Sequence, residues 1–182
     1  MFDLFAQILQ AILSLVPRLI IVRATHRGIK WRRGHTAVEM APGLHWYWPL
    51  VTEVELVVVA RQTLNTPSQA LLTSDQKQVT VGGVVVYRIN NAVLAYGEKN
   101  WDVDSTISDI TQAAIVRIIS KWPLEYLMKN LCDAVEKELT EECRKELRPF
   151  GLRVQRAAFT DFTTCKMIKL FMDSGGVPSQ EE

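Results

Sequence analysis

The spacing of apolar residues changes partway along this 182-residue chain, and no other feature limits the fold as much. Val79, Val81 and Val85 fall on alternate positions, as they would on one face of a β-strand. From Ser105 onward the apolar residues recur every three or four positions, which is typical of a helix. The sequence therefore predicts an α+β fold, with a mainly antiparallel first half and a helical second half meeting near Asn90.

The first half is rich in strand-forming residues. Glu53–Thr63 contains many β-branched side chains between Pro49 and Pro67, so one strand is predicted there. A second strand covers Gln78–Ile89, where apolar residues on both faces indicate that both faces are at least partly covered. Gly82–Gly83 inside this strand predicts a bulge or the close approach of another backbone.

The second half begins with a predicted helix that must end near Trp122–Pro123, because proline interrupts helices. Thr106 and Asp109 have the spacing of a capping pair at its start.

A second helical region covers Leu124–Arg148, with a break near Asn130, and Pro149–Phe150–Gly151 ends it. A last strand follows at Leu152–Phe162. The predicted buried stripe of the helical region consists of Leu131, Val135, Leu139, Cys143 and Leu147.

The N-terminal segment is almost entirely apolar. As a helix, residues 4–16 would be about 20 Å long, against roughly 30 Å for the hydrocarbon core of a bilayer. The prediction is an in-plane or re-entrant membrane helix within a membrane-associated segment, residues 1–22. The alternatives are a short span extended to Val22, with Arg18 at the headgroups, and a buried helix of a soluble core. The predicted membrane contacts here are Leu4, Phe5, Ile8, Leu9, Ile12, Leu13, Leu15 and Val16.

Charge is distributed unevenly although the formal net charge is only +1. Residues 1–38 hold six bases and one acid, so this part carries about +5 and the remainder about −4. Bases directly after an apolar segment indicate an anionic lipid surface and, by the positive-inside rule, a domain on the cytoplasmic side. No known nucleic-acid-binding motif accompanies the basic run, so nucleic acid is not predicted as a partner.

Aromatic residues near these bases predict a second membrane contact. Trp46, Tyr47 and Trp48 are consecutive, and large amphipathic rings favour the headgroup region. Trp31 precedes Arg32 and Arg33 in a similar combination. The alternative is that alternate rings pack into the core of the first half.

Nothing in the sequence indicates catalysis, a cofactor or a metal. The spacings of His26, His35 and His45 match no zinc signature, and Gly82–Gly83 belongs to no phosphate-binding motif. The chain also lacks a G-x-S-x-G element. Its three cysteines form no C-x-x-C pair, so reduced thiols are expected.

Several segments resemble the SPFH or band 7 domain of stomatins, prohibitins, flotillins and bacterial HflK and HflC. Pro42–Pro49 (PGLHWYWP) is similar to the PGLHF-x-x-P element of that family, and Leu71–Ile89 to its T-x-D-x-V-x-V…V-x-Y-R strand pair. Arg27–Gly34 resembles its first strand, and Pro123–Leu127 with Gly151–Phe162 resembles its second half. The resemblance covers about residues 19–170.

This resemblance implies a two-part SPFH fold on a membrane that assembles laterally into rings or cages and is not an enzyme. The chain lacks the long charged coiled-coil helix that follows the domain in relatives. A flat ring, a low-order oligomer or co-assembly with a longer relative is therefore expected in place of a tall cage.

The predicted function is a non-enzymatic membrane scaffold that organises lipids or membrane proteins. The alternative is a regulatory subunit of a membrane protease, channel or transporter. The predicted halves are residues 23–90 and 91–168, followed by a short disordered tail, residues 169–182. Homo-oligomer contacts are predicted at an apolar patch of Met167, Leu170 and Phe171.

Overall fold

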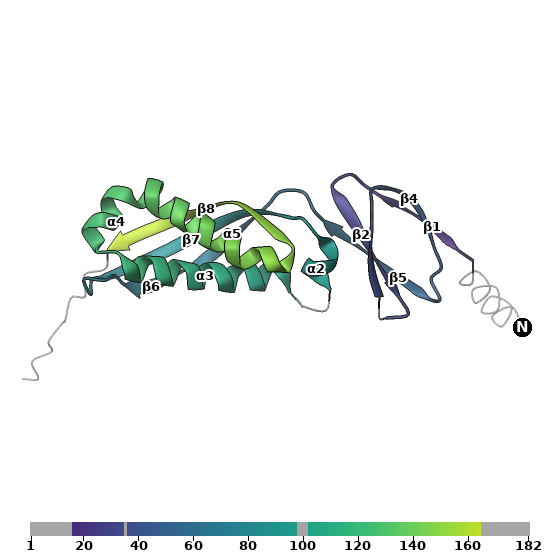
Figure 1. The fold of residues 1–182 in the computed structure, drawn as a ribbon, viewed down its shortest axis with the longest axis horizontal. Coiled ribbons are helices and arrows are strands. Elements are labelled where there is room, and N and C mark those ends of the chain that lie inside the picture. The colour runs from purple at the N-terminus through teal and green to yellow at the C-terminus, as the bar shows by residue number, and fades with distance from the viewer. Residues whose placement is uncertain (1–15, 35, 98–101, 165–182) are drawn as a thin grey trace, which may run out of the picture.

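The computed structural model describes residues 16–34, 36–97 and 102–164. The molecule is elongated, with the strands of the first half at one end and the helices at the other (Figure 1). The strands are β1 (Arg18–Val22), β2 (His26–Arg32), β3 (Thr36–Met40), β4 (Gly43–Tyr47), β5 (Thr52–Val58), β6 (Gln62–Leu72), β7 (Gln78–Ile89) and β8 (Leu152–Thr164). The α-helices are α2 (Ala92–Tyr96), α3 (Val103–Lys121), α4 (Leu124–Asn130) and α5 (Glu136–Leu147).

The described strands form three antiparallel sheets. β1 pairs with β4 in a two-stranded ribbon, and β2 lies between β3 and β5 in a three-stranded sheet. One face of this second sheet packs toward α2 and buries Ile29 and Val57. The third sheet has the order β6–β7–β8.

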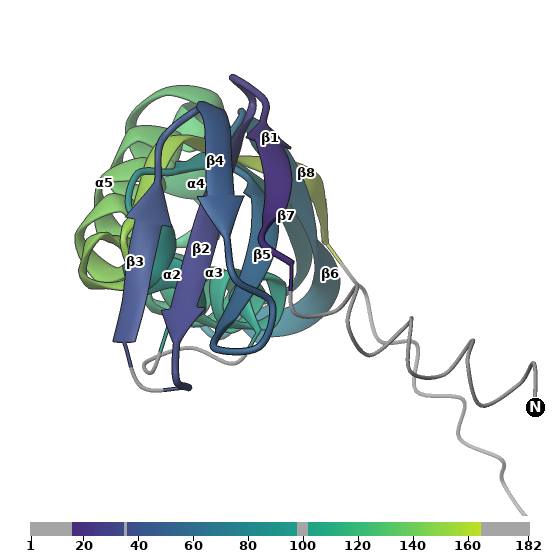
Figure 2. The same ribbon diagram turned by 90° about the vertical axis from the view of Figure 1, so that its right-hand side faces the viewer.

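The main core lies between the third sheet and the helices. In the view along the molecule, α3 and α5 lie on the same side of β7 (Figure 2). Helix α3 packs mainly on β6, and α5 packs on β8. The alternate apolar residues of β7 point into this core, as the period of two predicts. Ile29 and Val57 belong to the same buried cluster, so the two halves share one core.

The predicted strand Glu53–Thr63 is wrong as a single element. It is interrupted at residues 59–61, where the chain passes from the second sheet into the third. β6 then continues through Pro67, which was expected to end a strand. Proline fits here because β6 is an edge strand and its register shifts between Thr66 and Gln69.

Because β7 pairs with both β6 and β8, the third sheet joins strands from both predicted halves, and the chain enters this sheet after residues 59–61. Strand β1 also contradicts one of the alternatives predicted for the N-terminal segment. A membrane helix extended to Val22 is wrong, since Arg18–Val22 is a strand paired with β4. The membrane helix predicted for the first residues lies outside the described part of the chain.

The bulge predicted at Gly82–Gly83 is confirmed by a register shift between these residues in the β7–β8 pairing. A close approach is also present. A Cβ atom added at Gly83 would lie 2.8 Å from Cδ1 of Ile115 on α3. The glycine therefore allows α3 to pack directly on the sheet.

The predicted cap at Thr106 and Asp109 is wrong. Helix α3 begins earlier, with Asp102 as the N-cap, whose Oδ1 accepts hydrogen bonds from the backbone N–H groups of Asp104 (3.0 Å) and Ser105 (3.3 Å). The short helix α2 was not predicted, because five residues give too little pattern. Its N-cap is Asn91, which accepts from the N–H of Leu94 at 3.1 Å.

The break predicted near Asn130 is confirmed as a π-helical turn, Leu131–Val135, between α4 and α5. The end predicted at residues 149–151 is also confirmed. Gly151 adopts a positive φ of 73°, and its carbonyl accepts hydrogen bonds from the N–H groups of Asn90 (2.8 Å) and Asn91 (3.0 Å). The chain can therefore turn from α5 directly into β8.

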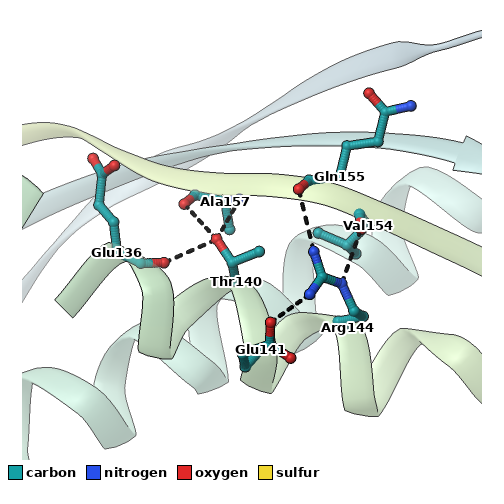
Figure 3. A network of polar contacts seen from close by, with 7 residues as sticks. All are labelled: Glu136, Thr140, Glu141, Arg144, Val154, Gln155 and Ala157. Atoms are coloured by element: carbon teal, nitrogen blue, oxygen red, sulfur yellow. Dashed lines mark hydrogen bonds and ion pairs between the residues drawn. The ribbon is translucent and has the colours of Figure 1, made fainter. Parts of the chain in front are cut away.

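Side chains of α5 satisfy backbone groups along the outer edge of β8 (Figure 3). The hydroxyl of Thr140 donates to the carbonyl of Ala157 (3.1 Å) and accepts from its N–H (3.0 Å). The guanidinium of Arg144 donates to the carbonyls of Val154 (3.3 Å) and Gln155 (3.4 Å). These contacts close an edge that would otherwise be free to pair with another strand.

The predicted apolar stripe of the second helical region faces the core. Its residues are buried except for Leu131, which is half-buried. Burial raises the pKa of the Cys143 thiol to about 11, so this cysteine is protonated at neutral pH. Cys132 is exposed, and both cysteines are free thiols.

Candidate membrane-contact surface

The β1–β4 ribbon has one exposed apolar face. In the register of the pair, Leu19 lies opposite Trp46 and Ile21 lies opposite Leu44. Directly opposed residues share a face, as do residues two apart on a strand. The exposed fractions of these four side chains lie between 51% and 68%. We call this set the ribbon face.

The ribbon face is continued by apolar residues in the adjoining segments. Val16 precedes β1, while Trp48, Leu50 and Val51 lie between β4 and β5, and all four are exposed. The β1–β4 ribbon, which these residues adjoin, lies at one end of the elongated molecule (Figure 1). Clustered exposed apolar residues of this kind mark a binding surface more often than a simple solvent-exposed surface.

The turn between β4 and β5 is held by several hydrogen bonds around Trp48. Its N–H donates to the hydroxyl of Thr52 at 3.1 Å, and its carbonyl accepts from the N–H groups of Val51 (3.2 Å) and Thr52 (3.0 Å). The N–H of Arg33 donates to the carbonyl of Val51 at 3.1 Å, from a residue with a positive φ of 48°. The turn therefore holds its apolar side chains outward without support from the core.

Basic side chains lie beside these aromatic residues. A shallow pocket of about 270 Å³ is lined by Lys30 and Arg32 of β2 together with Trp46, Tyr47 and Trp48. The structure thus brings together the two segments that the sequence predicted to contact a membrane. An adjacent pocket is lined by Arg32 and Arg33. Cationic groups beside amphipathic rings suit an anionic lipid headgroup with its acyl chain below.

Trp31 does not join this surface. It points to the opposite face of β2, where it is half-buried and packs against the main core. Of the residues predicted to contact a membrane, those from Leu4 to Leu15 lie outside the described part of the chain. Met167, Leu170 and Phe171, predicted as oligomer contacts, also lie outside it.

The sequence prediction missed the ribbon face. Leu19 and Ile21 were assigned to a membrane-associated segment, and only their pairing with β4 shows that they belong to a strand. The alternation in Arg18–Val22 is too short to be recognised alone, because one face carries only two of its residues.

Other types of site have less support in the residues that the structure describes. Within residues 16–34, 36–97 and 102–164, no group of three or more His, Cys, Asp or Glu side chains is arranged to hold a metal ion. In these same ranges, no helix combines the length and apolar character needed to cross a bilayer. The candidate site is the exposed ribbon face with its basic pocket.

The chain is similar to several known proteins. The chain is 25% identical to a stomatin homolog of Pyrococcus horikoshii over 150 residues, which cover 82% of this chain and 56% of that protein. It is 28% identical to human stomatin-like protein 3 over 148 residues, covering 79% and 49% of the two chains. It is 24% identical to the modulator of FtsH protease HflK of Escherichia coli over 133 residues, covering 73% and 32%.

The matched region spans between 32% and 56% of the length of these relatives. The sequence pattern of the SPFH domain / Band 7 family matches residues 20–174, which include every described strand and helix except the first two residues of β1. With the antiparallel sheets and the helical second half, this match shows that the chain belongs to the SPFH domain / Band 7 family.

Proposed function

We propose that this chain is a non-enzymatic membrane scaffold whose first half rests on the anionic, cytoplasmic surface of a bilayer. In this role it organises lipids or membrane proteins. The observation that carries the proposal is the ribbon face, which places four large apolar side chains in solvent next to Lys30 and Arg32. A soluble protein gains nothing from exposing these residues together, whereas a lipid surface would cover them.

The apolar contacts of the ribbon face and the electrostatic contacts of the nearby bases would contribute comparable binding energies. Burying a large apolar side chain fully contributes about 1.5–3 kcal/mol, and the residues of the ribbon face are already partly covered, so each contributes less. A base near an anionic surface contributes about 1 kcal/mol. Together these contacts support reversible binding and complement an anchor at residues 1–16, which we propose as the main attachment.

The ribbon also limits the depth of insertion. Among the described strands, β1 and β4 pair only with each other, so each has an outer edge with unpaired backbone groups. Such groups cannot enter the hydrocarbon core without a large desolvation cost. The ribbon face therefore lies at the headgroup level, where Trp and Tyr rings are also most favourable.

Vesicle binding tests the ribbon face. Replacing the opposed pair by L19T and W46T keeps strand propensity but removes most of the apolar surface. We expect binding to anionic vesicles to weaken by about tenfold, because roughly 1–2 kcal/mol of burial is lost. M128T is the matched control, since Met128 is 68% exposed on α4 at the far end of the molecule. Equal binding by the double variant, with an unchanged circular dichroism spectrum, would contradict the proposal.

The proposed anchor requires a separate truncation. A chain starting at Val16 keeps β1, whereas one starting at Arg23 would remove a strand of the fold. We expect the shortened chain to move largely to the soluble fraction while keeping its circular dichroism spectrum. Retention on membranes at high salt would place the main attachment elsewhere.

A second candidate function is regulation of a membrane protease, channel or transporter. It is favoured by similarity to a protein named as a modulator of the protease FtsH. Affinity purification from solubilised membranes distinguishes the two functions. A regulator co-purifies with one client in a fixed ratio, whereas a scaffold is recovered mainly with itself and with lipid.

We further propose that the chain forms homo-oligomers or co-assembles with a longer relative, and that Met167, Leu170 and Phe171 contribute an apolar contact. A chain ending at Thr164 keeps β8 and lacks this patch. Its mass in mild detergent tests the contact. An unchanged oligomer would show that assembly depends on other residues.

A further inference from the structure

A positively charged groove lies between α2, the end of α5 and the start of β8, in the middle part of the elongated molecule (Figure 1). Its volume is about 780 Å³, and Lys145, Arg148 and Arg153 line it. Arg88 and Arg153 line an adjoining pocket of about 590 Å³. All four bases are exposed residues. We call these four residues, with the two cavities that they line, the basic groove.

The four bases have no acidic partner in the part of the chain that the structure describes. No carboxylate there forms an ion pair with any of them. Glu141 also lines the groove, but its carboxylate pairs with the guanidinium of Arg144. Figure 3 shows Arg144 held in turn by the carbonyls of Val154 (3.3 Å) and Gln155 (3.4 Å). The described chain therefore leaves the charge of the basic groove uncompensated.

Local structure explains only two of these charges. Lys145 and Arg148 lie near the C-terminal end of α5, where the helix dipole favours positive charge. Arg88 and Arg153 have no such reason, because they lie directly opposite each other on β7 and β8. Like charges in opposed positions destabilise a sheet. An anionic ligand bound between the two guanidinium groups would remove this repulsion.

The arrangement of the bases favours a ligand with several spaced carboxylates. Arg88 and Arg153 form one close pair on adjacent strands, and Lys145 and Arg148 form a second pair three positions apart on a helix. A single small anion contacts one such pair at a time. Alternate side chains of an extended peptide lie about 7 Å apart on one side, so successive acidic residues can reach both pairs.

The remaining lining also suits a peptide. The exposed Asn90 carries a carboxamide, which is both a donor and an acceptor for backbone groups. Leu94 is 37% exposed and offers an apolar contact. Among the described residues that line the two cavities none is aromatic, whereas single-stranded nucleic acid is bound largely by stacking its bases on aromatic rings. These features favour an acidic peptide over nucleic acid.

We propose that the basic groove binds an extended acidic segment of a different protein. Carboxylates of this segment pair with Arg88 and Arg153 on the strands and with Lys145 and Arg148 on α5. Because these bases are exposed, the contact weakens as salt is added. The proposal goes beyond the membrane function, since the ribbon face and the basic groove share no residue.

Peptide binding to the full chain in mild detergent tests the proposal. The probe is a short, fluorescently labelled peptide of alternating glutamate and serine, and anisotropy measures its affinity. We expect R88Q with R153Q to weaken binding roughly tenfold, because two exposed ion pairs are lost. K145Q with K129Q should weaken it less, since only Lys145 lines the groove, and K145Q with R148Q should weaken it roughly tenfold.

Two controls separate the groove from overall charge. K129Q with K137Q removes the same number of charges at exposed positions that line neither cavity, and it should bind the peptide like the unmodified protein. The same peptide with glutamine in place of glutamate should not bind. Circular dichroism checks that each variant is folded.

Unfolding in urea gives a second measurement that needs no ligand. R88Q removes one of the two opposed charges, so its unfolding midpoint should rise, whereas K129Q should not raise it. A lower midpoint for R88Q would show that Arg88 supports the fold, and it would remove the reason to infer a ligand between these side chains.

Three binding results would overturn the inference. One is no binding of the glutamate peptide to the unmodified protein, and another is equal binding by both groove variants. The third is tighter binding of single-stranded DNA of equal charge, which would identify nucleic acid as the ligand. Vesicle binding by the same variants reports separately on the membrane function and should be unchanged, because the substituted residues lie outside the ribbon face.

Discussion

At the scale of single residues, the fold depends on a few side chains that join distant parts of the sequence. Asp75 in the β6–β7 turn is the best example. Its Oδ1 accepts hydrogen bonds from the Thr73 hydroxyl and from the backbone N–H of Leu124 (3.1 Å), and its Oδ2 lies 3.0 Å from the ammonium of Lys77. One carboxylate therefore links the turn to the first residue of α4.

These contacts predict an acid dependence of stability. The hydrogen bond from Thr73, then that from Lys77, hold the pKa of the Asp75 carboxyl at about 2, below its ordinary value of 3.8. Because the folded-state pKa is lowered, ionised Asp75 contributes stability that is present above about pH 4 and is lost as the pH falls through 2. We expect D75N to remove part of this dependence in urea unfolding at pH 2–5. D109N, at an exposed position on α3, should retain it.

At the scale of elements, the contact between α5 and β8 closes a sheet edge. β8 is the last strand of its sheet, so its outer backbone groups have no strand partner there. Thr140 and Arg144 satisfy several of them, and Glu136 adds an ion pair with Arg156 at 3.0 Å. The helix therefore both covers the core and prevents pairing of this edge with another chain.

We predict that T140V destabilises the protein by about 1–3 kcal/mol, because the methyl group leaves the N–H and carbonyl of Ala157 without their partner. Urea unfolding measures the loss, and hydrogen exchange should show faster exchange of the Ala157 amide. T63V is the matched control, since Thr63 is an exposed residue of β6. Equal stability of both variants would mean that the Thr140 contact is unimportant.

At the scale of the whole molecule, function depends on where different surfaces lie along the elongated fold. The ribbon face and the Lys30–Arg32 pocket lie at one end, and α4 lies at the other. A membrane contact at the first end would leave α4 away from the bilayer.

The basic pocket predicts salt-dependent membrane binding. We expect K30E with R32E to weaken binding to anionic vesicles by at least tenfold, since each reversal removes about 1 kcal/mol of attraction and adds repulsion. Lys30 and Arg32 are better targets than Arg33, whose positive φ makes any substitution ambiguous. The salt dependence of binding should flatten in the variant and stay unchanged in K129E. Equal binding of the unmodified protein to neutral and anionic vesicles would contradict an electrostatic role.

The sequence determined the α+β class, the helical region from residue 105 onward and the break before α5, because these depend on local periodicity and on proline and glycine. It also indicated the family, through short motifs that keep their order and spacing. The aromatic segment at residues 46–48 and the bases at residues 30–33 were recognised for the same reason.

Only the tertiary structure decided what these segments do together. The third sheet depends on the long-range pairing of β7 with β8, which no local pattern encodes. The ribbon face exists because β1 pairs with β4, and the core position of Trp31 follows from which face of β2 meets α2.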